Sequence, residues 1–513
     1  MQIERIKTIL RRLSVMMIAI IISFGQMSFT EDQMSAATTS FKGLWVATVY
    51  HIDFPSTPTT EPSLLKADIN AILDTAEAAG MNAVIVQVRP TGDALYASSI
   101  YPWSKFLTGE EDLAPQNGFD PLEYWVEEAH KRGIECHAWL NPYRITRDLK
   151  ADITDPFATL SSKNPAVKSP NLTVRYTDGN LYYNPGLPEV ESLIIAGVEE
   201  LINAYDIDGI HFDDYFYPGQ DFEDSSAYNR YKYFGESRDD FRRRSVTHMI
   251  AEVYKTVHNL SNDVVFGVSP FGIWANDTSS PDGSKTRGNQ SYSSHYADTK
   301  TWVERGIVDY IAPQLYWHIG YNIADYKVLA NWWADLVEGT DVDLYIGHGA
   351  YRVQTSDISA PWYGTSEIEK QIILNQTLPA IKGSIYYNYS ALRRSPDLIK
   401  TIAMQVCDSG DKEENAIFEE TFSDFLPQGD LKFQANTPIT LSCRAPLGTI
   451  VNVKIAGRYY FLKPVTETGE IVEYSVRIER PITLNQSSIT PHYTLRYKGV
   501  THEFDAVGKL LIE

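Results

Sequence analysis

Eight short apolar runs, each followed by a stretch of helical period, constrain the fold of this chain more than any other feature. The runs are rich in Val, Ile and Tyr, and they occupy residues 43–50, 82–90, 134–144, 208–218, 264–274, 310–320, 343–353 and 383–392. Strands that are apolar along their length and alternate with helices are typical of a parallel sheet covered by helices. Eight such units in ~350 residues predict an α/β fold, a closed (β/α)8 TIM barrel.

The helical stretches carry their own start and stop signals. Asp120 and Pro121 provide an N-cap and a first-turn proline for a helix over 120–133, and this stretch, like 64–80, ends in glycine. Further helices are expected over 189–205, 239–260, 295–306 and 366–381. An open doubly wound sheet is the alternative, but no G-x-G-x-x-G turn follows the first strand.

The sequence pattern changes near residue 400, where helical period gives way to period-two alternation with turn residues between. We therefore expect a barrel over residues 38–405 and an all-β sandwich of fibronectin or immunoglobulin type over residues 410–513. A spacer or packing role and a carbohydrate-binding role are both open for this second domain.

Residues 1–37 have the order of a secretory signal peptide. Lys7, Arg11 and Arg12 precede the apolar run 15–25, and Ser35-Ala36-Ala37 follow it. The apolar run is shorter than the ~20 residues that span a membrane. We expect a cleaved signal, no membrane span afterwards and a secreted or cell-envelope location, with an uncleaved anchor as the alternative.

Composition and motifs exclude several functional classes. The formal charge of −21 leaves no basic footprint for nucleic acid. The three cysteines, Cys136, Cys407 and Cys443, give neither a disulfide framework nor a zinc signature. The chain has no paired histidines at metal-ligand spacing, no G-x-S-x-G serine and no phosphate-binding loop. We therefore expect no metal and no cofactor, which leaves carboxylate chemistry such as glycoside hydrolysis.

Polar residues gather where the predicted strands end. Side chains alternate along a strand, so His211 and Asp213 share one face. An ionised carboxylate beneath the helices would be very costly, and this face should therefore look into the barrel mouth. The other candidate substrate-binding residues are Gln87, Arg89, Asn141, Tyr143, Arg144, Gln314, Tyr316, Trp317, His348 and Asn388. Amides, rings and guanidinium groups of this kind suit a sugar.

Several of these segments together resemble a known family. The segments GLWVATVYHIDFP, QVRPTGDALY, YPWSKFLTG, HAWLNPYR, YYNPGLPEV, DGIHFDDYFYP, APQLYW and YYNYSAL, spread over residues 40–400, are similar to the bacterial glycosyl-hydrolase-like family 10. The resemblance implies a TIM-barrel glycosidase of the cell envelope. It also implies a substrate class, peptidoglycan glycan strands stripped of their peptides, built from N-acetylmuramic acid and N-acetylglucosamine.

A wider analogy with amylase-like and chitinase-like barrels suggests catalytic roles. It gives Asp213 the role of nucleophile or charge-stabilising carboxylate. Asp214 is the expected general acid if the chain turns it into the cleft, and Asp93 is the reserve candidate, which we also count among the substrate-binding residues. Arg89 and Arg144 are candidates to bind the lactyl carboxylate of muramic acid, although each would also suit a salt bridge at the barrel rim.

Four tryptophans are candidate platforms for a sugar ring, and core packing explains each of them equally well: Trp103, Trp139, Trp317 and Trp362. Two other functions stay open. A metal-dependent polysaccharide de-N-acetylase also uses an F-D-D motif, but it needs companion histidine ligands. A non-catalytic sugar-binding barrel would explain why no glutamate acid is evident.

Overall fold

The computed structural model describes residues 40–147, 149, 153–404, 423–433, 438–447, 449–456, 458–466, 471–478, 488–497 and 500–512. The predicted signal peptide and Cys407 lie outside these residues. Within the described part of the chain, no helix combines the length and the apolar character that crossing a membrane requires.

Parallel strands close into an eight-fold barrel, as predicted. They are β1 (Phe41–Val46), β2 (Ala83–Arg89), β3 (Glu135–Leu140), β6 (Gly209–Phe212), β7 (Val265–Val268), β8 (Tyr310–Ile311), β9 (Gln314–Leu315), β10 (Asp343–His348) and β11 (Ile381–Tyr386). The short strands β8 and β9 are two parts of the one strand expected at 310–320, and both pair with β10. Strand β11 pairs with β10 on one side and with β1 on the other, which closes the ring.

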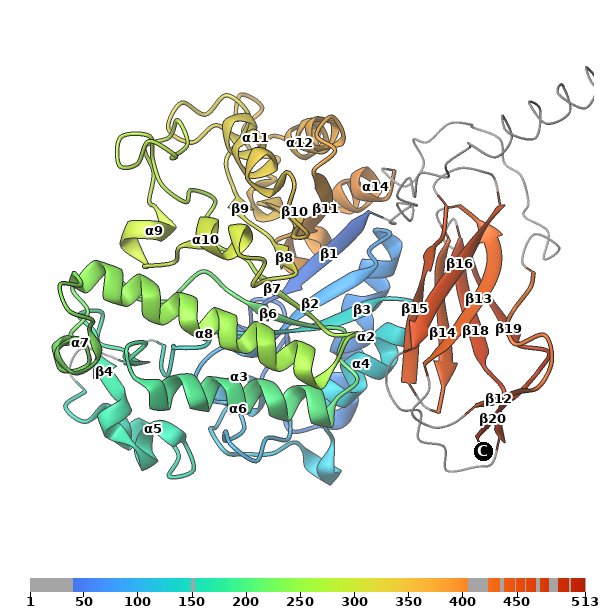
Figure 1. The fold of residues 1–513 in the computed structure, drawn as a ribbon, viewed down its shortest axis with the longest axis horizontal. Coiled ribbons are helices and arrows are strands. Elements are labelled where there is room, and N and C mark those ends of the chain that lie inside the picture. The colour runs from blue at the N-terminus through green and yellow to red at the C-terminus, as the bar shows by residue number, and fades with distance from the viewer. Residues whose placement is uncertain are drawn as a thin grey trace, which may run out of the picture.

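Helices cover the outside of this ring (Figure 1). They include α2 (Pro62–Ala78), α4 (Pro121–Lys131), α6 (Pro188–Ala204), α8 (Arg238–Leu260), α10 (Thr299–Glu304), α11 (Tyr326–Val337), α12 (Ser366–Gln376) and α14 (Pro396–Met404). The cap expected for α4 is present, since the Asp120 carboxylate accepts from the backbone N–H groups of Leu122 and Glu123. Gly80 and Gly133 follow α2 and α4 with positive φ, as a helix-ending glycine does.

The inside of the barrel is filled mainly by aromatic side chains. Trp45, Ile85, Trp139, Tyr310 and Ile385 are buried there. Two glycines make room for them. A Cβ at Gly267 would lie 2.0 Å from the Tyr310 ring, and a Cβ at Gly209 would lie 2.4 Å from the His137 ring. The interior is therefore a packed core, and a site on this barrel has to lie at one of its ends.

The connections after β3 and β6 are long, as expected. The first holds α5 (Pro165–Lys168) and the hairpin of β4 (Thr173–Arg175) and β5 (Leu181–Tyr183), and the second holds α7 (Ser225–Tyr231). The two connections meet where the rings of Tyr176 and Phe222 lie 6.1 Å apart. Three more short helices belong to such connections: α3 (Lys105–Thr108), α9 (Ser291–Ser294) and α13 (Tyr389–Arg394).

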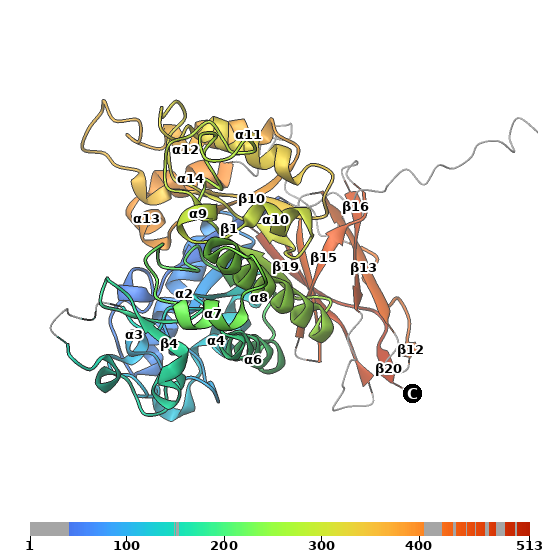
Figure 2. The same ribbon diagram turned by 60° about the vertical axis from the view of Figure 1, so that its left-hand side comes forward.

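The carboxyl-terminal part is all-β, as predicted, and it packs beside the barrel (Figures 1 and 2). One antiparallel sheet has the order β13-β16-β15-β14-β18-β19, and a smaller sheet has the order β12-β20-β17. The strands are β12 (Leu431–Phe433), β13 (Ile439–Pro446), β14 (Ile450–Ile455), β15 (Arg458–Pro464), β16 (Ile471–Ile478), β17 (Ser488–Ile489), β18 (His492–Tyr497), β19 (Val500–Asp505) and β20 (Leu510–Ile512). Its core is separate from that of the barrel and includes Leu441, Cys443, Val453, Tyr474 and Leu495.

This accessory domain contacts the amino-terminal ends of the barrel strands. The Asn452 side chain donates to the backbone oxygen of His130 at 3.2 Å, and the Tyr459 N–H donates to Asp206 at 3.3 Å. The rings of Tyr459 and Phe461 lie 5.1 and 5.6 Å from the His130 ring. The opposite end of the barrel, its mouth, is left to the βα connections.

Candidate active site

Two neighbouring carboxylates stand where β6 ends at the mouth. Asp213 is half-buried, and Asp214 is buried with 6% of its surface exposed. The backbone N–H of Asp214 donates to Asp213 Oδ1 at 2.8 Å. The strand ends at Phe212, so the chain turns here and both residues lie on the mouth side of the buried strand.

A relay of side-chain amides positions Asp213. Backbone N–H groups of Thr48 and Val49 donate to Gln87 Oε1, which leaves the Gln87 amide nitrogen to donate to Asn141 Oδ1 at 2.7 Å. Asn141 Nδ2 then donates to Asp213 Oδ2 at 2.9 Å. Each amide in the relay therefore has a fixed orientation, and the last one presents an N–H to the carboxylate.

A second amide reaches Asp213 from the other side. Gln314 Nε2 donates to the backbone oxygen of Ser269 at 2.9 Å and lies 3.4 Å from Asp213 Oδ1. With the Asn141 amide and the Asp214 backbone, three N–H groups surround the Asp213 carboxylate. An environment made of donors suits a carboxylate that acts as an acceptor.

The neighbouring carboxyl, Asp214, has an opposite environment. Burial raises its pKa well above the usual range, and the charge of Asp213 raises it further, while Arg144 works in the opposite direction. The mouth thus holds one carboxylate supplied with donors and, beside it, one carboxyl whose pKa is raised. Carboxyl groups whose surroundings differ in this way are typical of sites for acid/base chemistry.

Arg144 adds a positive charge to the same place. Its Nε donates to the backbone oxygen of Pro90 at 2.8 Å. Burial lowers its pKa, while Asp213 and Asp214 act in the opposite direction. A guanidinium group in the field of two carboxylates could bind an anionic substituent of a substrate.

Aromatic side chains flank the carboxylates on two sides. On one side the Tyr316 ring lies 5.6 Å from that of Tyr351 and 5.9 Å from that of Tyr387. Burial raises the pKa of Tyr316 and of Tyr387, and the charges of Asp213 and Asp214 add to that rise. Tyr351 and Tyr387 were not predicted. Tyr387 precedes the predicted site residue Asn388 at the end of the same strand, so its position in the sequence could have predicted that it lies at the mouth.

Tyr215, Phe271 and His295 form the other side. The rings of Phe271 and His295 stack at 4.5 Å, and Tyr215 meets each of them edge-on at 5.6 Å. Tyr215 is 44% exposed, and the charge of Asp214 is the first cause that raises its pKa to about 12. No sequence signal linked Phe271 or His295 to this site, because they come from the two ends of a long loop.

Arg89, Asp93 and Tyr143 lie elsewhere. A β-bulge after Gln87 pairs Arg89 with Leu140, so Arg89 leaves the inner face and packs beneath α6 with its guanidinium 3.8 Å from the Tyr101 ring. Asp93 is buried within its own loop, where it accepts from Thr91 Oγ1 at 2.6 Å. Tyr143 is buried in the layer between sheet and helices. The expectation that these three reach the mouth is not met.

The two predicted histidines are also structural. His211 is inside the barrel, where the Trp45 indole donates to its Nε2 and its Nδ1 faces the Tyr310 hydroxyl at 2.9 Å. Burial lowers the pKa of His211 well below the usual value, so the ring is neutral. His348 is on the outer face of β10, hydrogen-bonded to Gln371 and Ser384 at 2.9 and 3.0 Å.

Two further predicted residues lie at the margin of the site. Asn388 donates through Nδ2 to both oxygens of Asp53, which also accepts from the Ala47 and Ser390 backbones. This buried contact joins the first and last barrel strands, and Asp53 was not predicted. Trp317 is half-buried and packs against the outer core near Gly272.

The four candidate tryptophan platforms are all enclosed to some degree. Trp139 and Trp362 are buried, with 5% and 8% of their surfaces exposed, whereas Trp103 and Trp317 are half-buried against the outer core. Within the described residues, no three His, Cys, Asp or Glu side chains are grouped so as to hold a metal ion.

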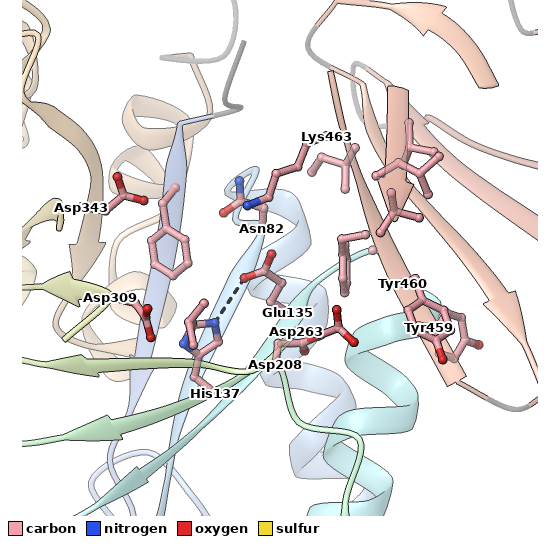
Figure 3. A pocket seen from close by; sticks show the side chains of 18 of the residues that line it. Asn82, Glu135, His137, Asp208, Asp263, Asp309, Asp343, Tyr459, Tyr460 and Lys463 are labelled. Atoms are coloured by element: carbon pink, nitrogen blue, oxygen red, sulfur yellow. Dashed lines mark hydrogen bonds and ion pairs between the residues drawn. The ribbon is translucent and has the colours of Figure 1, made fainter. Parts of the chain in front are cut away.

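A cavity of about 360 Å³ lies at the opposite end of the barrel, between the strand starts and the accessory domain (Figure 3). Several of its acidic side chains already have structural partners. Asp208 binds His130 and the Cys136 backbone, and Glu135 lies 3.2 Å from His137 Nε2. This cavity is therefore distinct from the carboxylate pair at the mouth.

Comparisons with known proteins agree with this architecture. Residues 40–364 match the family described as glycosyl hydrolase-like 10. Glycosyl hydrolase YngK of Bacillus subtilis (strain 168) is 43% identical over 366 residues, which cover 70% of each protein. Glycosyl hydrolase DigH of Escherichia coli (strain K12) is 40% identical over 369 residues, 69% of this chain and 84% of that protein.

Among solved structures, an endo-beta-1,4-mannanase from Thermotoga petrophila is similar with a TM-score of 0.45 and 11% identity, covering 93% of this chain and 98% of that one. The family assignment depends on the sequence matches and not on this likeness. On those matches, the chain belongs to the glycosyl hydrolase-like 10 family.

Proposed function

We propose that this protein is a glycoside hydrolase whose catalytic pair is Asp213 and Asp214. The observation that carries the proposal is the contrast between the two neighbours. Three N–H groups surround Asp213, while burial and the Asp213 charge raise the pKa of Asp214. Two carboxyl groups whose environments separate their proton affinities are the usual basis of glycosidic bond cleavage.

In this mechanism Asp214 donates its proton to the glycosidic oxygen as the bond to the anomeric carbon breaks. Asp213 stabilises, or attacks, the positive charge that develops on that carbon. The amides of Asn141 and Gln314 hold the Asp213 carboxylate in place, so little reorganisation is needed in the transition state. The exposed rings of Tyr215 and Tyr351 would contact the sugars on either side.

The proposed substrate is a peptidoglycan glycan strand without its peptides. Removing the peptide leaves a lactyl carboxylate on each muramic acid, and Arg144 provides a buried cation beside the catalytic pair that could bind it. The signal-like residues 1–37 support a secreted or envelope location, where such a substrate occurs. The curated relatives carry the name glycosyl hydrolase and no substrate.

The test is turnover by Asp213→Asn on purified peptide-free strands, followed by mass spectrometry of the products. We expect new reducing ends with the wild type, and a fall in kcat of at least ~100-fold in the variant. Asp335→Asn, an exposed site on α11, is the matched control and should leave kcat unchanged. Near-wild-type turnover by Asp213→Asn would remove Asp213 from the mechanism. Acetate release without new reducing ends would replace the proposal with de-N-acetylation.

A further inference from the structure

A turn between α7 and α8 presents two aromatic side chains to solvent. Tyr233 is 65% exposed, and Phe234 is 108% exposed, the highest value among the large apolar side chains of the described residues. Arg230 and Lys232, beside them in the chain, are exposed as well. We call these four residues the aromatic turn. Tyr233 and Phe234 are adjacent, so together they form an exposed apolar surface of the kind that binding sites use.

The aromatic turn is held in place from beneath. The Glu236 N–H donates to the Tyr233 oxygen at 3.2 Å, and the Glu236 carboxylate accepts from the Tyr233 N–H at 2.9 Å. Arg244 on α8 donates to the same carboxylate at 2.7 Å, and its guanidinium lies 4.0 Å from the Tyr233 ring. The Tyr228 hydroxyl donates to the Glu236 backbone oxygen at 2.7 Å. The exposed rings therefore belong to a braced turn, which lowers the entropy cost of binding a partner.

The charge of this segment is opposite to that of the molecule. Residues 228–244 contain six Lys or Arg and three Asp or Glu, within a chain of formal charge −21. The four arginines of this segment that belong to α8 pair with carboxylates: Arg238, Arg242, Arg243 and Arg244. Arg230 and Lys232 have no carboxylate partner among the residues that the structure describes. Arg230 lies over the Tyr231 ring at 5.1 Å and Lys232 over the Tyr228 ring at 4.5 Å, so both contact rings and, within the described part of the chain, form no ion pair. Two such cations beside two exposed rings suit an anionic ligand.

The aromatic turn belongs to the mouth side of the barrel. It lies on the connection that leaves β6 directly after Asp213 and Asp214, and such connections gather at the carboxyl ends of the strands. Figure 1 shows α7 and the first turns of α8 at the end of the barrel away from the accessory domain. The stretch between them and the carboxylates is packed, since the rings of Tyr217 and Phe222 lie 5.4 Å apart.

We propose that the aromatic turn is a distal binding site for an anionic glycan strand whose cleaved bond lies at Asp213 and Asp214. Tyr233 and Phe234 would stack on sugar rings, and Arg230 and Lys232 would pair with carboxylates carried by the strand. This inference rests on the proposed function, because a peptide-free strand repeats a lactyl carboxylate on every second sugar. The alternation of ring face and charge in such a strand matches the two kinds of side chain in the turn.

The first test measures binding in the inactive Asp213→Asn background, by calorimetry with long peptide-free strands. We expect Phe234→Ala, alone and with Tyr233→Ala, to weaken binding by about 10-fold. Arg230→Ala with Lys232→Ala should weaken it similarly and reduce its salt dependence. Val507→Ala and Lys400→Ala, exposed sites outside the aromatic turn, are the matched controls and should bind like the parent. Equal affinity in parent and Phe234→Ala would overturn the inference.

The second test uses the active enzyme and separates this inference from the proposed function. The ratio of kcat/KM on long strands to kcat/KM on tetrasaccharides should fall about 10-fold in Phe234→Ala. An unchanged ratio, with cleavage intact, overturns the distal site and leaves the glycosidase proposal standing. If binding depends on Phe234 but the protein cleaves no strand, the distal site stands and the glycosidase proposal is overturned.

A lipid surface is the competing occupant, because exposed aromatic and basic residues also suit anionic headgroups. Vesicles of phosphatidylglycerol test it directly. If Phe234→Ala abolishes sedimentation with vesicles while strand affinity stays unchanged, the turn binds lipid and the glycan assignment is wrong. If vesicles do not bind and strand affinity falls, the glycan assignment holds.

Discussion

At the scale of single residues, Asp213 and Asp214 show how two identical side chains acquire different chemistry. One accepts hydrogen bonds from two amides and a backbone N–H, and the other is buried next to its neighbour's charge. The raised pKa of Asp214 follows from position alone, because the same carboxyl in water would be ionised at neutral pH. This difference can be tested through pH and through the leaving group of the substrate.

We expect Asp214→Asn to lower kcat on glycan strands by ~100-fold to 10,000-fold, because the departing oxygen loses its proton donor. The basic limb of the kcat/KM profile, which reports loss of the Asp214 proton, should disappear with it. An aryl glycoside with a good leaving group needs no proton and should restore turnover in Asp214→Asn but not in Asp213→Asn. A basic limb that persists in the variant would assign the acid to another residue.

The same substitution should stabilise the protein at neutral pH. A carboxyl whose pKa is raised on folding favours the folded state less as pH rises from its unfolded value, ~3.9, through its folded value. Asn carries no charge, so the Tm of Asp214→Asn should exceed that of the wild type at pH 7, and the difference should vanish below about pH 4. Equal Tm values at pH 7 would show that folding does not raise the pKa of Asp214.

At the scale of elements, the sequence was sufficient wherever period and alternation are regular. All eight barrel strands and the Asp120 cap follow from local rules, and so does the placement of Gln87, Asn141 and Asp213 at strand ends. Arg89 departs because a bulge shifts its register, and nothing in residues 82–90 signals that bulge. His348 shares the outward face of Leu344 and Ile346, so alternation read more strictly would have placed it under the helices.

His348 links β10 to α12 and β11 and should make this contact sensitive to acid. Burial lowers its pKa to about 4, below the unfolded value of ~6.5, so the unfolded chain binds more protons between these two values. Stability is therefore full above pH ~6.5 and falls toward pH 4, by up to about 3 kcal/mol from this one group. Urea unfolding at a series of pH values should show a shallower pH dependence in His348→Asn. An unchanged slope would mean that the buried imidazole does not control this loss.

At the scale of the whole molecule, the barrel is used at both ends. The carboxylate pair and the long connections occupy the mouth, while the accessory domain covers the strand starts and encloses a cavity there (Figure 3). Sequence alternation predicted the two domains but could not predict this docking, because the contact depends on which surfaces are left exposed after each has folded. The fibronectin or immunoglobulin subtype stays a prediction.

The docking contact gives a prediction that separates packing from substrate binding. Tyr459 and Phe461 meet the His130 ring, and replacing both with Ala should remove about 1–2 kcal/mol each of apolar contact. Calorimetry should then resolve an earlier, separate unfolding transition for the accessory domain. Turnover of tetrasaccharides should stay at the wild-type value, because the contact is at the far end of the barrel from Asp213.

Val507→Ala, in the same domain but exposed, is the control. A single transition at the wild-type temperature would show that this contact does not couple the domains. A fall in strand affinity with docking intact would instead give the accessory domain a carbohydrate-binding role.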